Sequence, residues 1–364
     1  MNNPICKIAD VLFLRFELTD LEAQKEYLHH FGMQLVLETE DSIYYRGTGI
    51  APFCYCATKG ASNRFVSAAY YVDSRAELEA LASAMDVEII ASDEPGGGQK
   101  VTVQDPDGIG VEVFFGVEFN DLDSPTTPSL NTGFDKSRIN VLQRIGKDAE
   151  EWQLEDNEWR YKLASKVMRI GHYAINVESV DAAIKWYQET LGLLISDDLV
   201  MPDGKRSGAF MRANRGQTPV DHHVINIVGL RKGREGYGGT FGHGGFELTG
   251  SIDDLMAGHY HMKTLGTYMH EWGIGRHLLG SQIYDYWRDP AGFTLEHWTD
   301  GDLVNEDHPT AIVPAKHFSL GQYGPLPPST FNLSLPNEKV EAWRTDHTPV
   351  VELIKPFEKQ NQES

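Results

Sequence analysis

The order of apolar and polar residues predicts the same succession of elements twice along the chain. Residues 11–36 and residues 171–195 each read as an alternating strand, a short polar break, an amphipathic helix and a further strand. The two predicted helices end at Gly32 and Gly192, because glycine readily adopts the left-handed backbone of a helix C-terminus. The chain therefore contains an internal repeat.

Two further correspondences extend this repeat. An Asp-Pro-x-Gly turn leads into a strand that carries Glu112, and a second such turn leads into a strand that carries Glu296. A weaker match sets residues 65–72 against residues 241–248. We therefore predict an α+β fold of two tandem halves, each made of paired βαβββ modules.

The repeat divides the chain into four predicted parts. They are an N-terminal domain (1–120), a linker (121–167), a C-terminal domain (168–300) and a proline-rich C-terminal arm (301–364). In the linker, Trp152 and Trp159 suggest a helix that docks on a neighbouring domain. The prolines of the arm exclude a long helix, so we expect an extended segment that wraps the body or a partner subunit.

Composition and charge narrow the function classes. With 41% apolar and 23% charged residues, the 364-residue chain is typical of a globular protein with a large core. A net charge of −21 argues against binding to nucleic acid or to an anionic membrane surface. The three cysteines do not suggest a disulfide framework. Because the N-terminus lacks the pattern of a signal peptide and no apolar run could span a membrane, we expect a cytoplasmic protein.

Histidine is concentrated in the second half of the chain, where nine of the fourteen histidines lie between residues 172 and 297. Aligning the halves on their glycine and Asp-Pro landmarks gives three pairs: His172 with Leu12, His243 with Ser67, and Glu296 with Glu112. Two imidazoles and one carboxylate form a donor set that leaves three positions of Fe(II) open for substrate and oxygen. A single histidine in a strand is more often a packing or surface residue. Three such residues at equivalent strand positions favour a metal site in the second half and a scaffold role for the first.

The second half resembles the catalytic domain of the type I extradiol (catechol meta-cleavage) dioxygenases of the vicinal oxygen chelate superfamily. The most specific stretch is residues 275–296, in which a Gly-Arg-His element precedes a strand with a tyrosine, an Asp-Pro turn and a glutamate. The resemblance covers roughly residues 7–300 and implies the vicinal oxygen chelate, or glyoxalase-like, fold. It implies Fe(II), or Mn(II) with the same ligands, held by His172, His243 and Glu296.

The resemblance also implies an activity and three catalytic residues: His223, His277 and Tyr286. The expected enzyme inserts O2 into a catechol-type aromatic diol and gives a hydroxymuconic semialdehyde-type product, in the degradation of aromatic compounds. Tyr286 and His277 would orient the diol. His223, preferred over its neighbour His222, would face the oxygen and donate a proton.

Aromatic residues near these positions are candidates for a substrate pocket, although such residues usually belong to the core. Tyr284 shares a strand face with Tyr286, and Trp298 shares one with Glu296. Trp272 stands where relatives that take acidic catechols can carry an arginine, which favours an apolar or aryl substituent. With the nearby His270, the expected substrate-binding residues are Trp272, Tyr284, Trp298 and His270.

Three alternatives stay open at the level of sequence. A 4-hydroxyphenylpyruvate-type α-keto acid dioxygenase would use the same ligands but would not need the three catalytic residues. A glyoxalase-type isomerase draws ligands from both halves, where Leu12 and Ser67 cannot serve. A non-catalytic ligand-binding protein of the same fold would need no stoichiometric iron. The expected partners are a small aromatic diol and O2, and the proline-rich arm suggests a homo-oligomer.

Overall fold

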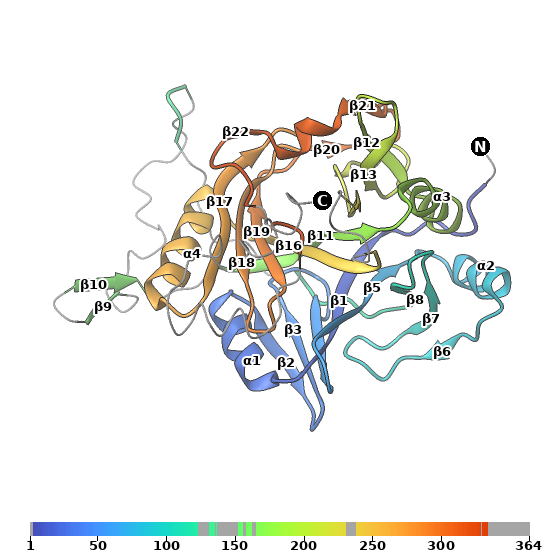
Figure 1. Cartoon of the computed structure of the whole chain (residues 1–364). Coiled ribbons are helices and arrows are strands. Elements are labelled where there is room, and N and C mark those ends of the chain that lie inside the picture. The colour runs from blue at the N-terminus through green and yellow to red at the C-terminus, as the bar shows by residue number, and fades with distance from the viewer. Residues whose placement is uncertain are drawn as a thin grey trace, which may run out of the picture.

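The computed structural model describes residues 3–122, 131–134, 136, 152–155, 158–161, 165–230, 238–328 and 330–333. The described residues form two large sheets flanked by four α-helices, with loops between them (Figure 1). The first sheet has eight strands in the order β2-β3-β4-β1-β5-β8-β7-β6. Its strands are β1 (Asp10–Leu18), β2 (Gln34–Glu38), β3 (Ser42–Arg46), β4 (Tyr55–Lys59), β5 (Arg64–Tyr71), β6 (Ile90–Ala91), β7 (Gln99–Gln104) and β8 (Gly110–Phe115). Helices α1 (Leu21–His30) and α2 (Arg75–Met85) connect them.

The second sheet repeats this order as β12-β13-β15-β11-β16-β19-β18-β17 and adds β21 and β22 at its two edges. Its strands are β11 (Val167–Val177), β12 (Leu194–Val200), β13 (Arg206–Arg212), β15 (Ile225–Gly229), β16 (Thr240–Leu248), β17 (Met269–His277), β18 (Ile283–Arg288), β19 (Thr294–Thr299), β21 (Ala311–Pro314) and β22 (Gly321–Tyr323). Helices α3 (Val180–Leu191) and α4 (Ile252–Leu265) follow β11 and β16. The repeated strand order confirms the predicted fold of paired βαβββ modules.

Strand register corrects one of the three predicted residue pairs. His172 lies opposite Gly245, and Phe13 lies opposite Ala69. Gly245 pairs with Glu296 and Ala69 pairs with Glu112, so Gly245 and Ala69 occupy equivalent positions. His172 therefore corresponds to Phe13. The predicted pairing of His172 with Leu12 is therefore wrong by one residue, whereas the same registers confirm the other two pairs.

The reason for this shift lies in the lengths of the two helices. Gly192 is itself the C-cap of α3, with φ of 73°, whereas Phe31 caps α1 and Gly32 follows it with φ of 96°. Both glycines have the left-handed backbone that the sequence predicts. His172 and Phe13 each lie seven residues before the N-cap of the following helix, Ser179 and Asp20, but α3 has 12 residues and α1 has 10. Because Gly32 lies one residue beyond its cap, this difference of two becomes a difference of one when positions are counted back from the glycines.

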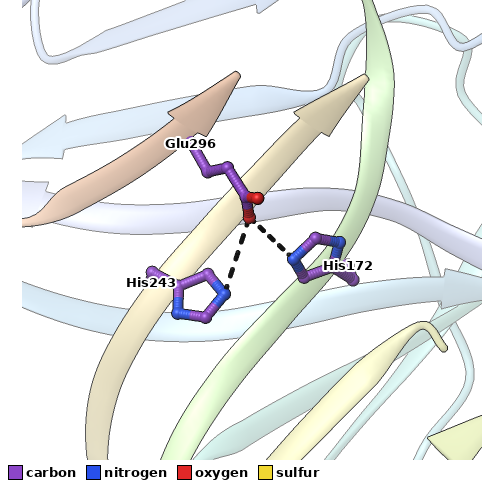
Figure 2. A group of neighbouring side chains, drawn as sticks. All are labelled: His172, His243 and Glu296. Carbon is purple, nitrogen blue, oxygen red and sulfur yellow. Dashed lines mark ion pairs between the residues drawn. The ribbon is translucent and has the colours of Figure 1, made fainter. Parts of the chain in front are cut away.

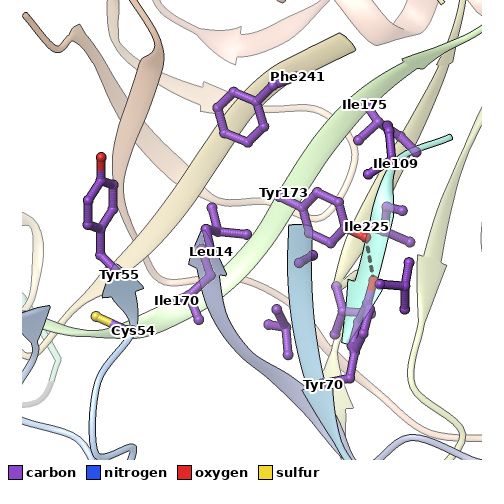
Figure 3. Packing of buried hydrophobic residues seen from close by; sticks show 14 of the residues in the cluster. Leu14, Cys54, Tyr55, Tyr70, Ile109, Ile170, Tyr173, Ile175, Ile225 and Phe241 are labelled. Atoms are coloured by element: carbon purple, nitrogen blue, oxygen red, sulfur yellow. Dashed lines mark hydrogen bonds between the residues drawn. The ribbon is translucent and has the colours of Figure 1, made fainter. Parts of the chain in front are cut away.

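The two halves share one hydrophobic core, in which β1 and β5 of the first half face β11 and β16 of the second (Figure 3). The ring of Phe16 contacts that of Phe241 at a centroid distance of 5.3 Å. Within this core, the hydroxyls of Tyr70 and Tyr173 are hydrogen-bonded at 2.6 Å. This packing buries β11 and β16, the strands from which His172 and His243 project.

The linker and the arm differ in part from their predicted structures. The described linker residues include a hairpin of β9 (Trp152–Glu155) and β10 (Glu158–Tyr161), where the sequence suggested a helix. The described part of the arm wraps the body of the protein, which is one of its two predicted courses, because β21 pairs with β12 and β22 pairs with β17. Between these strands lies a short 3-10 helix, Ala315–Ser319. Residues 334–364 of the arm lie outside the described residues.

Other sequence expectations concern the whole chain. The three cysteines are free and buried. Within the described ranges, no helix is both long enough and apolar enough to cross a bilayer. The domain boundaries near residues 120, 167 and 300 stay a proposal, as do the homo-oligomer and the cytoplasmic location.

Candidate active site

Three neighbouring strands of the second sheet bring the predicted metal ligands together. His172 on β11, His243 on β16 and Glu296 on β19 converge in Figure 2, and their potential ligand atoms all lie within 4.8 Å of one another. Glu296 Oε2 lies 2.9 Å from His172 Nε2 and 3.7 Å from His243 Nε2. All three side chains are buried. The spacing fits ligands that share one ion.

The electrostatics of these residues also fit a divalent cation. Among the described residues, the Glu296 carboxylate has no cationic side chain beside it; its polar neighbours are imidazoles and the Tyr286 hydroxyl. Burial raises the pKa of Glu296 to about 8 and lowers the pKa of His172 to about 3 and that of His243 to about 4. The imidazoles are therefore neutral, as metal ligands must be, and a bound cation would supply the charge that the buried carboxylate lacks.

The C-terminal arm completes the surroundings of His243. Asn332 Oδ1 lies 2.6 Å from His243 Nδ1, and it can accept the proton of that nitrogen while Nε2 faces Glu296. The backbone carbonyl of Asn332 accepts a hydrogen bond of 2.9 Å from Asn176 Nδ2. The ring of Phe331 stacks on His243 at a centroid distance of 5.4 Å. The sequence analysis missed these contacts, because nothing in the arm repeats a pattern of the body.

The three predicted catalytic residues lie around the same cavity. His277 Nε2 and the hydroxyl of Tyr286 are 3.0 Å apart, and His277 Nε2 lies 3.9 Å from Glu296 Oε1. The ring of His223 lies on another side, 4.4 Å from the ring of His172. Burial, reinforced by neighbouring histidines, holds the pKa values of His223 and His277 well below their ordinary range, so both rings are neutral.

His222 occupies a supporting position next to His223. Its Nδ1 lies 3.3 Å from His223 Nδ1, and its Nε2 lies 3.1 Å from Asp197 Oδ2. The cavity is lined by His223 but not by His222. This placement favours His223 as the residue of the pair that meets a substrate.

The predicted substrate-binding aromatic residues form a layer behind the predicted catalytic side chains. Trp272 stacks on Tyr286 at 5.3 Å and 11°, and Tyr284 stacks on His277 at 4.0 Å and 27°. Trp298 lies beside the metal-ligand candidates, with its ring 6.0 Å from that of His172. None of these three residues lines the cavity. Their position suits them to hold the catalytic rings in place.

His270 lies on the other face of β17, away from the cavity. Its Nε2 is 2.7 Å from Asp285 Oδ1, beneath α4. A strict alternation would place His270 and Trp272 on one face, but a register shift between them makes the strand irregular. Such a β-bulge turns one side chain to the opposite face. We therefore leave His270 out of the proposed substrate pocket.

The walls of the cavity come largely from parts of the chain that the sequence analysis did not single out. Its empty volume is about 400 Å³, part of it open to solvent. Besides the histidines and Tyr286, the lining consists mainly of apolar side chains: Phe210 on β13, Leu278 and Leu279 after β17, and Phe318, Leu320 and Phe331 of the arm. The cavity therefore has histidines and Tyr286 on one side and mainly apolar side chains, its apolar wall, on the other.

Comparison with known proteins agrees with this fold. Residues 169–297 match the sequence model of the Glyoxalase/Bleomycin resistance protein/Dioxygenase superfamily. A curated relative, Metapyrocatechase 2 of Cupriavidus necator, is 30% identical over 168 residues. That match covers 45% of this chain and 46% of the relative, so it spans about half of each protein.

Solved structures resemble the chain over most of its length. The homoprotocatechuate 2,3-dioxygenase of Arthrobacter globiformis has a TM-score of 0.69 at 21% identity and covers 93% of this chain and 96% of its own. The Mn(II)-bound glyoxalase of Novosphingobium aromaticivorans has a TM-score of 0.67 at 22% identity and covers 90% of this chain and 97% of its own. These likenesses confirm the vicinal oxygen chelate fold. Together with the curated relative, they confirm the resemblance to extradiol dioxygenases.

Proposed function

We propose that the chain is a metal-dependent extradiol dioxygenase that cleaves a catechol-type aromatic diol with O2 and gives a hydroxymuconic semialdehyde-type product. The observation that carries this proposal is the buried two-histidine, one-glutamate set beside three further protonatable side chains in one cavity. Such a donor set leaves positions open for a diol and for oxygen. The relative named metapyrocatechase and the fold of homoprotocatechuate 2,3-dioxygenase support the same activity.

The proposed metal is Fe(II), and Mn(II) suits the same ligands. His172, His243 and Glu296 would hold it, and the arm residue Asn332 would orient His243. When bound, the metal supplies a positive charge that lowers the pKa of the diol hydroxyls and a centre at which diol and O2 meet.

Tyr286 and His277 are proposed to bind and orient the diol. Burial raises the pKa of the Tyr286 hydroxyl well above its ordinary value, so this group keeps its proton and can donate a hydrogen bond to a diol oxygen. The neutral ring of His277, 3.0 Å from that hydroxyl, can accept a proton from the diol. The two residues would thus hold the substrate and take up one proton.

His223 is proposed to act on the oxygen side of the cavity. Its ring contacts His172 and Phe210, whereas Tyr286 and His277 lie toward His243 and Glu296. A neutral imidazole in this place can donate a hydrogen bond to oxygen, take up the second proton of the diol and then pass that proton on. A positioned acid-base group of this kind typically contributes about 10²–10⁴-fold in rate.

The proposed substrate is a catechol with an uncharged substituent. The described residues that line the cavity include no arginine or lysine to pair with a carboxylate on the ring. The apolar side chains of Phe210, Phe318 and Leu320 would instead contact an alkyl or aryl group. Trp272, which stacks behind Tyr286, contributes no charge either.

The test is a substrate panel with the full chain, reconstituted anaerobically with Fe(II). We expect oxygen uptake and a new visible chromophore with catechol, alkylcatechols and 2,3-dihydroxybiphenyl, and weaker reaction with protocatechuate-type acids. α-Keto acids such as 4-hydroxyphenylpyruvate should give no uptake. Oxygen uptake with keto acids alone would contradict the proposed reaction, and a preference for the acidic catechols would contradict the proposed pocket.

A further inference from the structure

We propose that His259, His270 and Asp285 form a second divalent-metal site, of the kind that binds zinc, on the outer face of the second sheet. The proposed dioxygenase function uses none of these residues. They come from three elements, since His259 lies on α4, His270 on β17 and Asp285 on β18. Their potential ligand atoms all lie within 4.8 Å of one another, as those of His172, His243 and Glu296 do.

One carboxylate oxygen lies at the centre of this group. Asp285 Oδ1 is 2.7 Å from His270 Nε2 and 3.1 Å from His259 Nδ1. The other oxygen, Oδ2, accepts a hydrogen bond of 2.6 Å from the indole Nε1 of Trp287. This bond holds the carboxylate in place, with His259 Nδ1 3.1 Å from both of its oxygens and His270 Nε2 next to Oδ1. A neighbour that orients a coordinating group in this way is typical of metal sites.

Burial of the three side chains suits an ion that enters from solvent. The Asp285 side chain is fully buried, whereas 12% of the His259 side chain and 32% of the His270 side chain are exposed. The carboxylate is therefore held in place beneath the two rings, and the outer side of the site is open. Two imidazoles, one carboxylate and a water molecule from the open side would complete the four ligands that zinc prefers.

The second site is separate from the cavity because of strand geometry. Successive residues of a strand point to opposite faces, so Asp285 points outward where Tyr286 points into the cavity. The bulge between His270 and Trp272 turns His270 outward as well. Imidazole ligands favour zinc, nickel and copper ions, and zinc is the natural probe.

The experiment measures Zn²⁺ binding to the metal-free full chain by competition with a chromophoric chelator. We expect two ions per chain, one at each site. A His243→Ala variant, which damages the cavity site, should keep one tightly bound ion. Adding His259→Gln and His270→Gln to that variant should remove it and weaken Zn²⁺ binding at least 100-fold. The matched control is His29→Gln, an exposed histidine on α1, which should change nothing.

A second measurement does not depend on the variants' folding. Crystals of the unmodified chain grown with Zn²⁺ should show an anomalous peak between His259 Nδ1, His270 Nε2 and Asp285 Oδ1 at the zinc absorption edge. A peak in the cavity alone, or a zinc stoichiometry that the two His→Gln substitutions leave unchanged, would overturn the proposal. Either result would leave the dioxygenase proposal untouched, because that proposal is tested by oxygen uptake.

Discussion

The hydrogen bond from His243 to the arm residue Asn332 should control how tightly the cavity holds its metal. Asn332 is buried, and its side-chain oxygen is the acceptor 2.6 Å from His243 Nδ1. The clearest perturbation is Asn332→Gly, because φ at this position is 63° and glycine adopts that backbone without strain. The substitution removes the acceptor and leaves the fold of the arm free to persist.

The expected magnitude follows from the burial of this bond. Leaving a buried donor such as the Nδ1–H of His243 without its partner costs about 1–3 kcal/mol. Loss of a residue that orients a metal-bound histidine typically weakens metal affinity by about 10–100-fold, which corresponds to about 1.4–2.7 kcal/mol. The two estimates agree, so we expect the Kd for Mn(II) to rise by about 10–100-fold.

The assay is competition between the protein and a fluorescent chelator for Mn(II), which avoids oxidation during the measurement. Asn332→Asp is the matched control, because it keeps an acceptor oxygen and also tolerates the left-handed backbone. It should bind Mn(II) at least as tightly as the unmodified chain. Equal affinity of Asn332→Gly and the unmodified chain, within twofold, would refute the idea that the arm orients the ligand.

Three further predictions test the site and the fold. His223→Ala should lower turnover of a catechol by about 10²–10⁴-fold while metal content, measured by elemental analysis, stays the same; full activity would exclude the proton-donor role. Arg288 should be essential for stability. Its guanidinium donates hydrogen bonds of 2.8 and 2.9 Å to the buried carboxylate of Glu271, and it also donates to the backbone carbonyls of residues 330 and 333 in the arm. Arg288→Met should cost about 3–5 kcal/mol in urea unfolding, because it leaves the glutamate buried and unpaired, whereas a loss under 1 kcal/mol would contradict this reading. Burial raises the pKa of Asp289 to about 7, so the protonated carboxyl should stabilise the fold below about pH 4, and this stabilisation should be lost as pH rises through 7. The Asp289→Asn variant should therefore lose less unfolding free energy between pH 5 and pH 8 than the unmodified chain. Equal losses in the two proteins would disprove the raised pKa of Asp289.

Much of the fold could be predicted because its signals are local. Alternating strands, helix-ending glycines and Asp-Pro turns each depend on a few neighbouring residues, and they recur in both halves. The metal-ligand candidates could be found because the halves share a glutamate at one strand position and differ at two others, where only the second half has histidine. His243 stands where the first half has Ser67, and this difference carries more information than either residue alone.

The rest of the site depends on contacts that no local pattern encodes. Asn332 lies 89 residues from His243 along the chain, and only the fold brings them together. The apolar wall formed by Phe318 and Phe331 has the same origin. The position of His270 was obscured by one bulge, since a single extra residue in β17 turns a side chain from the cavity to the outer face.

In the first half, the glutamate at the equivalent sheet position is surrounded by charged side chains of the protein itself. Glu112, the counterpart of Glu296, is also buried, but Arg15 Nε lies 2.6 Å away, Lys100 Nζ 2.7 Å away and Ser67 Oγ 2.5 Å away. Burial acts to raise the pKa of Glu112, and the charges and hydrogen bonds of Arg15 and Lys100 outweigh it, so the pKa lies below its ordinary value.

The buried carboxylates of Glu112 and Glu296 therefore have different sources of compensating charge. A carboxylate buried at this point of the sheet needs positive charge nearby, because an uncompensated buried charge is costly. The first half supplies that charge with Arg15 and Lys100 and so closes the position to any ligand. The second half offers Glu296 only uncharged groups, the imidazoles of His172, His243 and His277 and the hydroxyl of Tyr286, which leaves a cation as the missing charge. This contrast within one chain is an argument for a metal in the second half that does not depend on any relative.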